Sequence, residues 1–461
     1  MTAEQATGRL VVVSNRVAPI SEGEPAAGGL AVGVLDALRA KGGLWFGWSG
    51  EIADGPVVPR PARNVGPITV ATIDLSRTDY DQFYRGFANG TLWPVLHYQM
   101  GLSRFDWDEF AGYRRVNELF ARSLASLVQP DDLIWAHDYH LLGLAEALRA
   151  AGVRNRAGLF LHTPFPEPGV LMSVPAHAQL VRAMCEFDLI GFQTEPDRTA
   201  FCDYISRQAG GRALEEGRLE AFGRVVRSGV YPIGVHVEDV RAEAENPAQR
   251  REAMRVRKDL AGKLLVLSVD RLDYSKGLRQ RFTAFERFLQ DNPHRRGDVV
   301  LTQIAPPSRG DIETYREIRR ELEGEAGRIN GRFADLDWVP LRYLNRAFPR
   351  AALMPLYAEA RVGLVTPLRD GMNLVAKEYV AAQDPDDPGV LILSQFAGAA
   401  RELEAALIVN PYDEAGMATA LEQALEMGLE ERRGRYAAMM DVLRRNSLDR
   451  WRARFEADLG A

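Results

Sequence analysis

Short runs of apolar residues alternate with amphipathic helical patterns along the whole chain. Runs this rich in Val, Ile and Leu are typical of strands buried on both faces. In the first half, they cover Leu10–Ser14, Ile68–Ile73, Leu133–His137, Gly158–His162 and Leu189–Gln193. In the second half, they cover Leu264–Val269, Val299–Ile304, Val362–Thr366, Val390–Ser394 and Leu407–Asn410. Helical stretches such as Gly277–Gln290 and Asp311–Ile329 separate them. The alternation predicts βαβ units with parallel sheets, and hence an α/β fold.

The series of strands and helices breaks near Tyr231–Glu238, after which a charged helix over 238–259 leads into the second series. A chain of 461 residues is also too long for one compact core. We therefore expect two doubly wound domains, 1–236 and 237–445, with a ligand-binding cleft between them.

The last helical pattern, over 446–461, carries Trp451 and Phe455 one turn apart. Residues at this spacing lie on the same side of a helix. We expect this helix to pack back onto the first domain, which leaves no residues for a third domain.

Composition narrows the class of protein. The charged fraction of 26% and the hydrophobic fraction of 46% are those of globular proteins. The net charge of -6 argues against a nucleic-acid binder, and no apolar run is long enough for a membrane span or a signal peptide. With only two cysteines, the simplest prediction is an enzyme of the cytoplasm.

In the first half, two segments carry residues suited to ligand binding. Arg16 ends the first strand, and Gly28 and Gly29 then open a helical pattern whose backbone N–H groups could meet an anion. The alternative is a pair of turn glycines. Tyr84 and Trp93 could line a pocket, although their local sequence alone favours core packing.

The next two strands end in polar residues. Asp138 lies in the segment His137–His140, directly after a strand, and His162 ends the following strand. A metal would need further ligands that the nearby sequence lacks. We therefore favour a role for Asp138 in binding a substrate hydroxyl, at the sheet edge where open α/β folds bind ligands.

The second half opens with the segment Asp270–Gly277, which follows its first strand. Arg271 and Lys276 could converge on one diphosphate, Arg by its two-pronged guanidinium and Lys as a point charge. Arg309 follows the next strand and adds a positive charge at the same edge. The P-loop motif of nucleoside triphosphatases, G-x-x-x-x-G-K-S/T, is absent, so an NTPase is not expected.

The segment Arg369–Glu378 runs from a strand through a turn into a helix. Asp370 lies in the turn, and Leu374 lies near the helix N-terminus, whose amides can bind hydroxyls or phosphate. Glu378 lies one turn beyond Leu374 and could accept from both hydroxyls of a ribose. The alternative is that Glu378 is a solvated helix residue.

Many motifs, in order along nearly the whole chain, resemble one family. They are VVVSNR, AGGLAVG, GGLWFGWSG, LWPVLHY, WAHDYHLL, HTPFP, GFQTE, YPIGV, DRLDYSKG, QIAPPSRGD, EAGRING, LVTPLRDGMNLVAKEYVAAQ and LSQFAGAA. The chain resembles the trehalose-6-phosphate synthases, which are retaining glycosyltransferases of the GT-B fold, with two Rossmann-like domains facing across a cleft. The resemblance implies transfer of glucose from a nucleotide sugar, most simply UDP-glucose, to glucose 6-phosphate.

The resemblance also implies roles for individual residues. It assigns the donor to Gly28, Gly29, Arg271, Lys276, Phe348, Asp370, Leu374, Val375, Glu378 and His162. It assigns the acceptor to Arg16, Tyr84, Trp93, Asp138 and Arg309. Arg271 and Lys276 would stabilise the leaving diphosphate without a metal or other cofactor, and His162 and Asp370 would position the donor glucose. The leaving phosphate would accept the acceptor's proton in a front-face attack.

Several alternatives stay open. Ala347 stands where relatives carry histidine, beside Phe348 in the stretch expected at the donor base, so the base could be uracil, guanine or adenine. Another acceptor would make the protein a glucosylglycerol-phosphate synthase or a cyclitol pseudo-glycosyltransferase, and loss of turnover would make it a sugar-phosphate sensor. A separate phosphatase is expected downstream, and a homo-oligomer is an open expectation.

Overall fold

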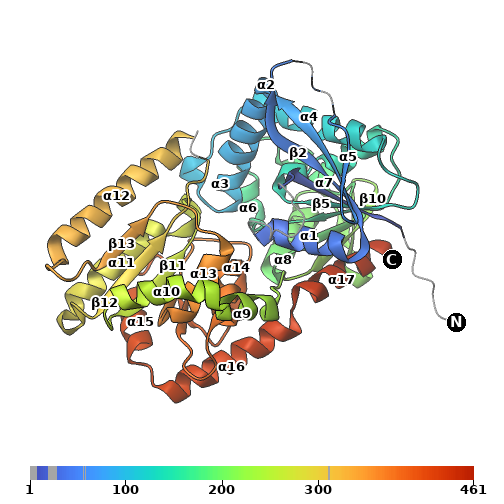
Figure 1. The fold of residues 1–461 in the computed structure, drawn as a ribbon. Helices are drawn as coiled ribbons and strands as arrows, with labels where there is room; N and C mark the ends of the chain where they lie inside the picture. The colour runs from blue at the N-terminus through green and yellow to red at the C-terminus, as the bar shows by residue number, and fades with distance from the viewer. Residues whose placement is uncertain (1–7, 19–28, 56, 58, 310–311) are drawn as a thin grey trace. The chain divides into compact units, whose positions relative to one another are not determined.

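The computed structural model describes residues 8–18, 29–55, 57, 59–309 and 312–461 (Figure 1). The chain forms two compact units. The first unit comprises Met1–Pro232 and Trp451–Ala461, and the second unit comprises Ile233–Arg450. The division thus falls at 232–233, where the sequence placed it at 236–237.

The first unit is built on one sheet, with strand order β3-β4-β2-β1-β5-β6-β7-β10-β9-β8 among the described residues. The strands are β1 Leu10–Arg16, β2 Gly43–Ala53, β3 Arg63–Val65, β4 Ile68–Ser76, β5 Leu133–His137, β6 Ala157–Phe160, β7 Leu189–Phe192, β8 Arg212–Ala213, β9 Arg218–Ala221 and β10 Arg224–Val230. From β4 to β10 every neighbouring pair is parallel, as predicted. The sequence pattern did not predict β2 and β10, nor the short antiparallel strands at the two edges. The edge strands are too polar to show the apolar runs of buried strands.

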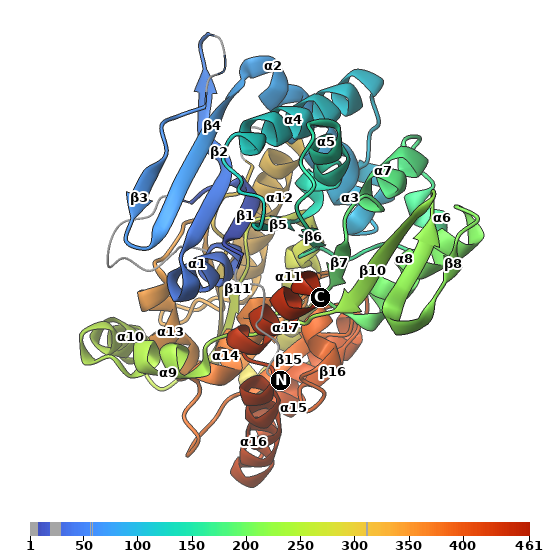
Figure 2. The ribbon, with the colours of Figure 1, turned by 90° about the vertical axis from the view of Figure 1, so that its right-hand side faces the viewer.

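Helices cover both faces of this sheet (Figures 1 and 2). The longer ones are α1 Gly29–Lys41, the π-helix η1 Tyr80–Leu92, α4 Trp107–Ala125, α5 Leu144–Ala150, α7 His177–Met184, α8 Glu195–Arg207 and α17 Leu448–Gly460. The short ones are α2 Arg77–Asp79, α3 Trp93–Leu96, α6 Pro168–Leu171, η2 Met100–Leu102, η3 Tyr139–Leu141 and η4 Glu215–Gly217. Helix α4 packs against η1 and α5, and α5 packs against α7.

The C-terminal helix α17, red in Figure 2, contacts the first sheet through the two aromatic residues that the sequence singled out. Phe455 stacks on Trp135 with ring centroids 4.6 Å apart, and Trp451 lies 4.9 Å from the same ring. A Cβ atom at Gly191 of β7 would lie 2.7 Å from the Phe455 ring. Glycine at this position therefore lets the helix approach the sheet closely.

The second unit has a parallel sheet with strand order β13-β12-β11-β14-β15-β16. Its strands are β11 Leu264–Val269, β12 Val299–Ile304, β13 Leu341–Leu344, β14 Val362–Val365, β15 Val390–Ser394 and β16 Leu407–Val409. The chain leaves β11 in one direction and returns beside it at β14, so the strand order reverses there, where doubly wound sheets bind ligands. The predicted fold class, two doubly wound α/β domains with parallel sheets, is confirmed.

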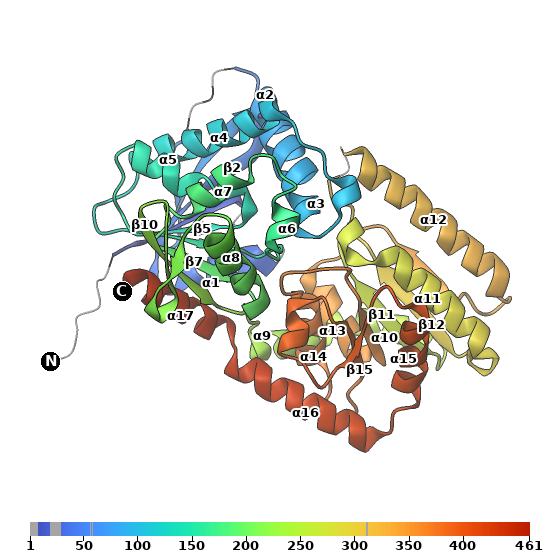
Figure 3. The same cartoon turned by 180° about the vertical axis from the view of Figure 1, so that it is seen from behind.

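The helices of the second unit pack in two groups (Figure 3). They are α9 Val237–Glu245, α10 Pro247–Asp259, α11 Leu278–Asp291, α12 Glu313–Phe333, α13 Arg350–Glu359, α14 Leu374–Ala382, α15 Glu414–Glu426 and α16 Leu429–Arg445, with the 3-10 turns η5 Tyr274–Lys276, η6 Pro293–Arg295 and η7 Gly398–Arg401. Helix α11 contacts α12 and α15, whereas α9 contacts α10, α13 and α14. The single helix predicted over 238–259 is wrong: Asn246 caps a new helix that begins at Pro247. Within the described ranges, no helix is long and apolar enough to cross a membrane.

A buried lysine ties α14 to both ends of the second unit. The fully buried Lys377 donates from Nζ to the carbonyl oxygen of Ile233, at 2.7 Å, and to Glu402, at 2.5 Å. Asn446, just after α16, donates to the other oxygen of Glu402 at 2.8 Å. Burial lowers the pKa of Lys377 against the attraction of Glu402. This cluster therefore fixes α14 to the segments where the chain enters and leaves the unit.

Replacing Lys377 by Met should destabilise the second unit by about 3 kcal/mol, because it leaves a buried carboxylate without its cation. Denaturant unfolding at neutral pH measures this loss. Lys258→Met, at an exposed position on α10, is the matched control and should change stability by less than about 0.5 kcal/mol. Equal stability of the two variants would show that Lys377 does not anchor α14.

Candidate functional site

The turn 270–277, which follows β11, carries two of the predicted donor residues. Lys276 ends η5, and Asp273 caps this turn by accepting from the backbone N–H of Ser275 at 2.9 Å. Gly277 follows with φ of 66°, in the left-handed region that favours glycine. A Cβ there would lie 2.4 Å from the carbonyl oxygen of Thr366, so the turn closes tightly against the end of β14.

Arg281 of α11 fixes the turn 270–277 through a hydrogen bond to its backbone. Its side chain is completely buried and forms an ion pair with Asp270 at 3.0 Å. The guanidinium also donates to Gln303 at 2.7 Å, to Thr366 at 3.1 Å and to the carbonyl oxygen of Lys276 at 3.1 Å. One side chain thus joins β11, β12, the end of β14 and the turn.

The structure brings Lys276 and Asp370 together, although the sequence separates them by 94 positions. Lys276 Nζ lies 2.5 Å from Asp370 Oδ2, and both side chains are largely buried. Asn373 donates to the same oxygen at 3.0 Å. Asn373 also caps α14, with φ of 73° and its side-chain oxygen accepting from the N–H of Ala376. The carboxylate of Asp370 is therefore fixed from two sides at the start of a helix.

Glu378 lies one turn into the same helix. Its side chain is 14% exposed and forms an ion pair with Arg350 at 2.6 Å, while Arg350 also pairs with Glu243 at 3.1 Å. Burial raises the pKa of Glu378 against the attraction of Arg350. The alternative that Glu378 is a solvated helix residue is wrong. Leu374 and Val375, in the first turn of α14, are partly exposed.

The carboxylate of Asp273 lies near three cationic side chains at the edge of the second sheet. The Arg309 guanidinium lies 3.0 Å from Asp273 Oδ2 and 2.5 Å from the hydroxyl of Tyr315. Burial acts to raise the pKa of Asp273, but the charges of Arg309, Arg271 and Lys276 lower it to about 2. Arg271 itself is exposed. The guanidinium of Arg309, predicted to hold an acceptor phosphate, therefore lies on an internal carboxylate here.

Phe348 lies in the loop between β13 and α13, beside the exposed Ala347. The guanidinium of Arg346 lies over its ring, 4.5 Å from the centroid. Such a cation–π pair holds an aromatic side chain in place at a partly exposed position. Contact of Phe348 with a nucleotide base stays a prediction.

In the first unit, Arg16 ends β1 and is exposed. Its guanidinium lies 5.7 Å from the ring centroid of Trp48. A Cβ at Gly50, which has φ of 94°, would lie 2.5 Å from two of its nitrogens, so only glycine leaves room for this arrangement. Gly29 begins α1, whereas Gly28 lies outside the described residues.

Tyr84 lies in the π-helix η1, a form that is often found at functional sites. Its ring stacks on Tyr80 at 5.4 Å and on His140 at 5.8 Å, and lies 5.7 Å from Trp48. The side chain is partly exposed. The aromatic neighbours therefore hold Tyr84 with part of its surface open.

Trp93, the first residue of α3 directly after η1, is only 5% exposed. Its ring packs against His97 at 3.9 Å and against Tyr139 at 5.5 Å. The core packing that the local sequence favoured describes this residue in the structure. A ligand contact through its remaining exposed edge stays a prediction.

Asp138 and His162 lie together at the ends of β5 and β6. The carboxylate of Asp138 accepts from the backbone N–H of His162 at 3.3 Å. Asp138 has φ of 76° and ψ of 171°, a conformation that is nearly confined to glycine and costs about 1–3 kcal/mol elsewhere. Strain of this kind is concentrated at functional sites. The His162 ring also lies 3.1 Å from His137, through the atoms Nε2 and Nδ1.

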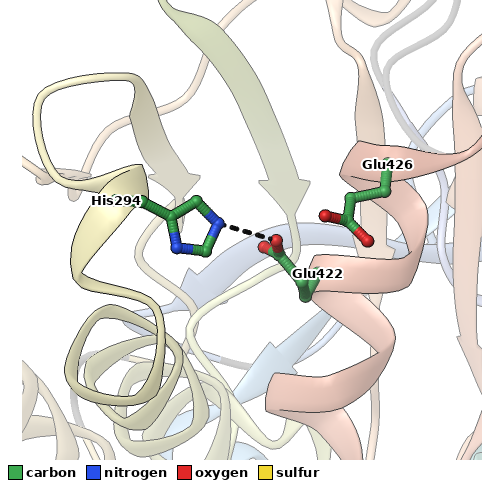
Figure 4. A group of neighbouring side chains, drawn as sticks. All are labelled: His294, Glu422 and Glu426. Atoms are coloured by element: carbon green, nitrogen blue, oxygen red, sulfur yellow. Dashed lines mark hydrogen bonds and ion pairs between the residues drawn. The ribbon is translucent and has the colours of Figure 1, made fainter.

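One group of side chains has metal-ligand chemistry within the described residues. His294, Glu422 and Glu426 place ligand atoms within 4.8 Å of one another (Figure 4). Arg295 pairs with Glu422 at 2.9 Å and with Glu426 at 3.5 Å, and His294 and Glu426 are exposed. A guanidinium thus already balances these carboxylates, so the group is a surface ion-pair cluster.

Arg281, Arg350 and the pairing of His137 with His162 are not indicated by the sequence pattern. Arg281 lies within the predicted helix Gly277–Gln290, where an arginine normally indicates an exposed face. Arg350 has no motif signal. The sequence around His137 suggests only a metal ligand, whereas the β5–β6 pairing of His137 with Phe160 explains its position beside His162.

Comparison with known proteins agrees with the motifs. The pattern of Glycosyltransferase family 20 matches residues 9–461. A trehalose-6-phosphate synthase from Klebsiella pneumoniae is 52% identical over 453 residues, which cover 98% of this chain and 95% of that protein.

Solved structures are equally similar. An alpha,alpha-trehalose-phosphate synthase (UDP-forming) from Burkholderia xenovorans, in complex with glucose-6-phosphate, has a TM-score of 0.95 at 55% identity, covering 98% of this chain and 100% of that chain. A structure titled as trehalose-6-phosphate from Escherichia coli, bound with UDP-2-fluoro glucose, has a TM-score of 0.93 at 50% identity, with 98% and 99% of the two chains covered. The chain therefore belongs to glycosyltransferase family 20 and has the GT-B fold.

Proposed function

We propose that this protein acts as a trehalose-6-phosphate synthase. It transfers glucose from UDP-glucose to glucose 6-phosphate with retention of the anomeric configuration, the first step of trehalose biosynthesis. The identity of about half of the residues to such synthases, along almost the whole chain, supports this activity. The observation in this molecule that carries the proposal is the fixed pair Lys276–Asp370 at the reversal point of the second sheet.

Cleavage of the donor bond places negative charge on the leaving diphosphate. Lys276 and Arg271 follow β11 on one short turn, which Arg281 holds in place. A fixed ammonium and an exposed guanidinium lower the energy of the developing charge without having to reorganise. We assign the stabilisation of the leaving group to these two residues.

Asp370 is assigned to the donor glucose as a positioning group. Its Oδ2 accepts from Lys276 and from Asn373, which leaves a carboxylate held in one orientation beside the N-terminus of α14. Such a carboxylate is suited to accept from sugar hydroxyls. In a front-face reaction the leaving phosphate oxygen takes the proton of the attacking hydroxyl, so no carboxylate nucleophile is required.

The remaining predicted donor residues surround the rest of the nucleotide sugar. The partly exposed Leu374 and Val375 lie in the turn that offers free backbone N–H groups, and Glu378 follows with its carboxylate already desolvated. A desolvated carboxylate next to Arg350 would bind ribose hydroxyls once they displace part of that ion pair. Gly28 and Gly29 complete the proposed set; of these two, Gly29 begins α1, and Gly28 lies outside the described residues.

The acceptor is assigned to residues that carry charge and aromatic surface. The exposed guanidinium of Arg16 and the open part of Tyr84 suit a sugar phosphate, and the strained Asp138 suits a sugar hydroxyl. Arg309 would exchange Asp273 for the acceptor phosphate. We include Trp93 in the acceptor set. We also propose that residues 1–236 form the acceptor-binding domain and 237–445 the donor-binding domain, with Arg309 crossing to the acceptor and Gly28, Gly29 and His162 to the donor.

Because the disaccharide product carries a phosphate, we expect a separate phosphatase to remove this phosphate in the next reaction. We place the reaction in the cytoplasm, in keeping with the two free thiols Cys185 and Cys202. A homo-oligomer remains part of the proposal without a defined interface.

Purified protein incubated with UDP-glucose and glucose 6-phosphate should release UDP and form a non-reducing disaccharide phosphate, measured by coupled assay and mass spectrometry. GDP-glucose and ADP-glucose test the donor base, and glycerol 3-phosphate tests the alternative acceptor. Turnover with none of the three donors would contradict the proposal, and binding without UDP release would favour a sensor.

Lys276→Ala should lower kcat by about a hundredfold to a thousandfold, because it removes a fixed charge from the leaving diphosphate. Steady-state kinetics with saturating substrates measure the effect, and circular dichroism checks the fold. The matched control, Lys258→Ala on the exposed face of α10, should retain wild-type turnover. A Lys276→Ala enzyme as fast as the wild type would remove this residue from the mechanism.

Arg16→Gln should raise KM for glucose 6-phosphate by about tenfold, with a smaller change in kcat, because a charge-assisted hydrogen bond to phosphate is lost. The comparison of KM values for glucose 6-phosphate and for UDP-glucose separates the two substrates. Arg63→Gln, at an exposed position on β3, serves as the control. If KM for the donor rose instead, Arg16 would belong to the donor site.

A further inference from the structure

Two histidine rings meet at the ends of neighbouring parallel strands of the first unit. His137 is the last residue of β5, and His162 follows β6. His137 Nδ1 lies 3.1 Å from His162 Nε2, and the rings stack with centroids 5.3 Å apart. This contact is a hydrogen bond between side chains and is not used by the mechanism above.

The pair lies in an aromatic surrounding. His137 is 1% exposed and packs against Trp135 at 4.7 Å, while Phe160 and Trp451 lie 4.7 Å and 6.2 Å from His162. Burial lowers the pKa of His162 to about 3 and holds the pKa of His137 well below its ordinary value. Both rings are therefore neutral near pH 7, so each has one N–H group and one lone pair.

The charged group closest in the chain is Asp138, which follows His137 directly. Its carboxylate accepts from the backbone N–H of His162 at 3.3 Å, so it is engaged with the main chain of that residue. The neighbouring side chains Trp135, Phe160 and Trp451 carry no charge. The arrangement of the two protons is therefore decided mainly by hydrogen bonding within the pair.

The far nitrogen of His137 indicates which ring donates. His137 Nε2 is buried and has no hydrogen-bond partner among the described residues. Buried N–H groups without a partner are rarer in proteins than acceptors without one. This favours a proton on Nδ1 of His137, which then donates to Nε2 of His162. His162 must in turn carry its own proton on Nδ1.

We propose that His137 is a positioning residue that fixes His162 as the Nδ1–H tautomer, so that His162 offers a neutral N–H donor to a sugar hydroxyl oxygen. His162 is partly exposed, and the hydrogen bond of its ring to another side chain runs through Nε2, on the side of His137. Together with the carboxylate of Asp138, it gives this sheet edge one donor and one acceptor for hydroxyl groups. The assignment of the sugar rests on the proposed function.

The tautomer is measured directly by 15N NMR of the histidine rings in the free wild-type enzyme, with His162 assigned by comparison with His162→Gln. We expect Nδ1 of His162 to show the shift of a protonated nitrogen and Nε2 that of an unprotonated one, across pH 6–8. A proton on Nε2 would overturn the proposal. Because no substrate is present, this result is independent of whether the proposed reaction is correct.

Two variants separate positioning from packing. Asn at position 137 places an amide nitrogen as far along the side chain as Nδ1, so His137→Asn should keep the tautomer and most of the activity. His137→Phe fills the space but cannot donate, so it should lose the tautomer preference and lower kcat/KM for the donor by about five- to tenfold. The control is His177→Phe, which removes a histidine of α7 that is hydrogen-bonded to Tyr204 of α8 and should leave kcat/KM unchanged.

Equal kcat/KM for the Asn and Phe variants would overturn the positioning role, as would an unchanged His162 tautomer in His137→Phe. If His137→Phe does not fold, the wild-type and His137→Asn spectra still decide the tautomer. An inactive wild-type enzyme that nevertheless shows the Nδ1–H form would reject the proposed reaction and retain the pairing of the two histidines.

Discussion

The position of the turn 270–277 in the second unit depends on one buried charge, the guanidinium of Arg281. No part of this side chain is exposed, and it binds Asp270, Gln303, Thr366 and the carbonyl oxygen of Lys276. A buried cation is costly to desolvate unless all of its donors are engaged. Since its partners come from the ends of adjacent strands and from the turn 270–277, satisfying the charge also fixes where Lys276 lies. The chemistry assigned to Lys276 thus rests on a residue that need not touch a substrate.

In the first unit, uncharged groups fix the side chains at the sheet edge, where the second unit uses a buried cation. Its sheet edge presents a strained aspartate, Asp138, and two uncharged histidines, His137 and His162, within an aromatic surrounding. Neutral rings avoid the cost of burying charge and supply direction through their tautomers. A sugar is recognised by donors and acceptors in fixed positions, whereas a diphosphate is recognised by charge, and the two sheet edges differ in this way.

Much of this could be predicted from the sequence, because the signals are local. Strands buried on both faces show as apolar runs, and motifs such as DRLDYSKG identify Arg271 and Lys276 by their place after a strand. The predictions that failed also have local causes. Pro247 splits one expected helix into two, and the polar strands β8 and β9 lack the apolar runs that indicate a buried strand. Arg281 and Arg350 could not be found, since nothing in a helical pattern tells a buried arginine from an exposed one.

The fold class, the family and the residue types at each strand end can be identified from the amino-acid sequence alone. Hydrophobic periodicity and the order of the motifs are properties of the linear chain, so they can be recognised without knowing how it folds. Which of these residues become partners is visible only in the folded molecule: Lys276 pairs with Asp370, Glu378 with Arg350, and His137 with His162. These pairs join positions far apart in the chain, and their charge states and tautomers follow from burial. Burial is a property of the packed molecule, so the sequence pattern alone cannot supply it.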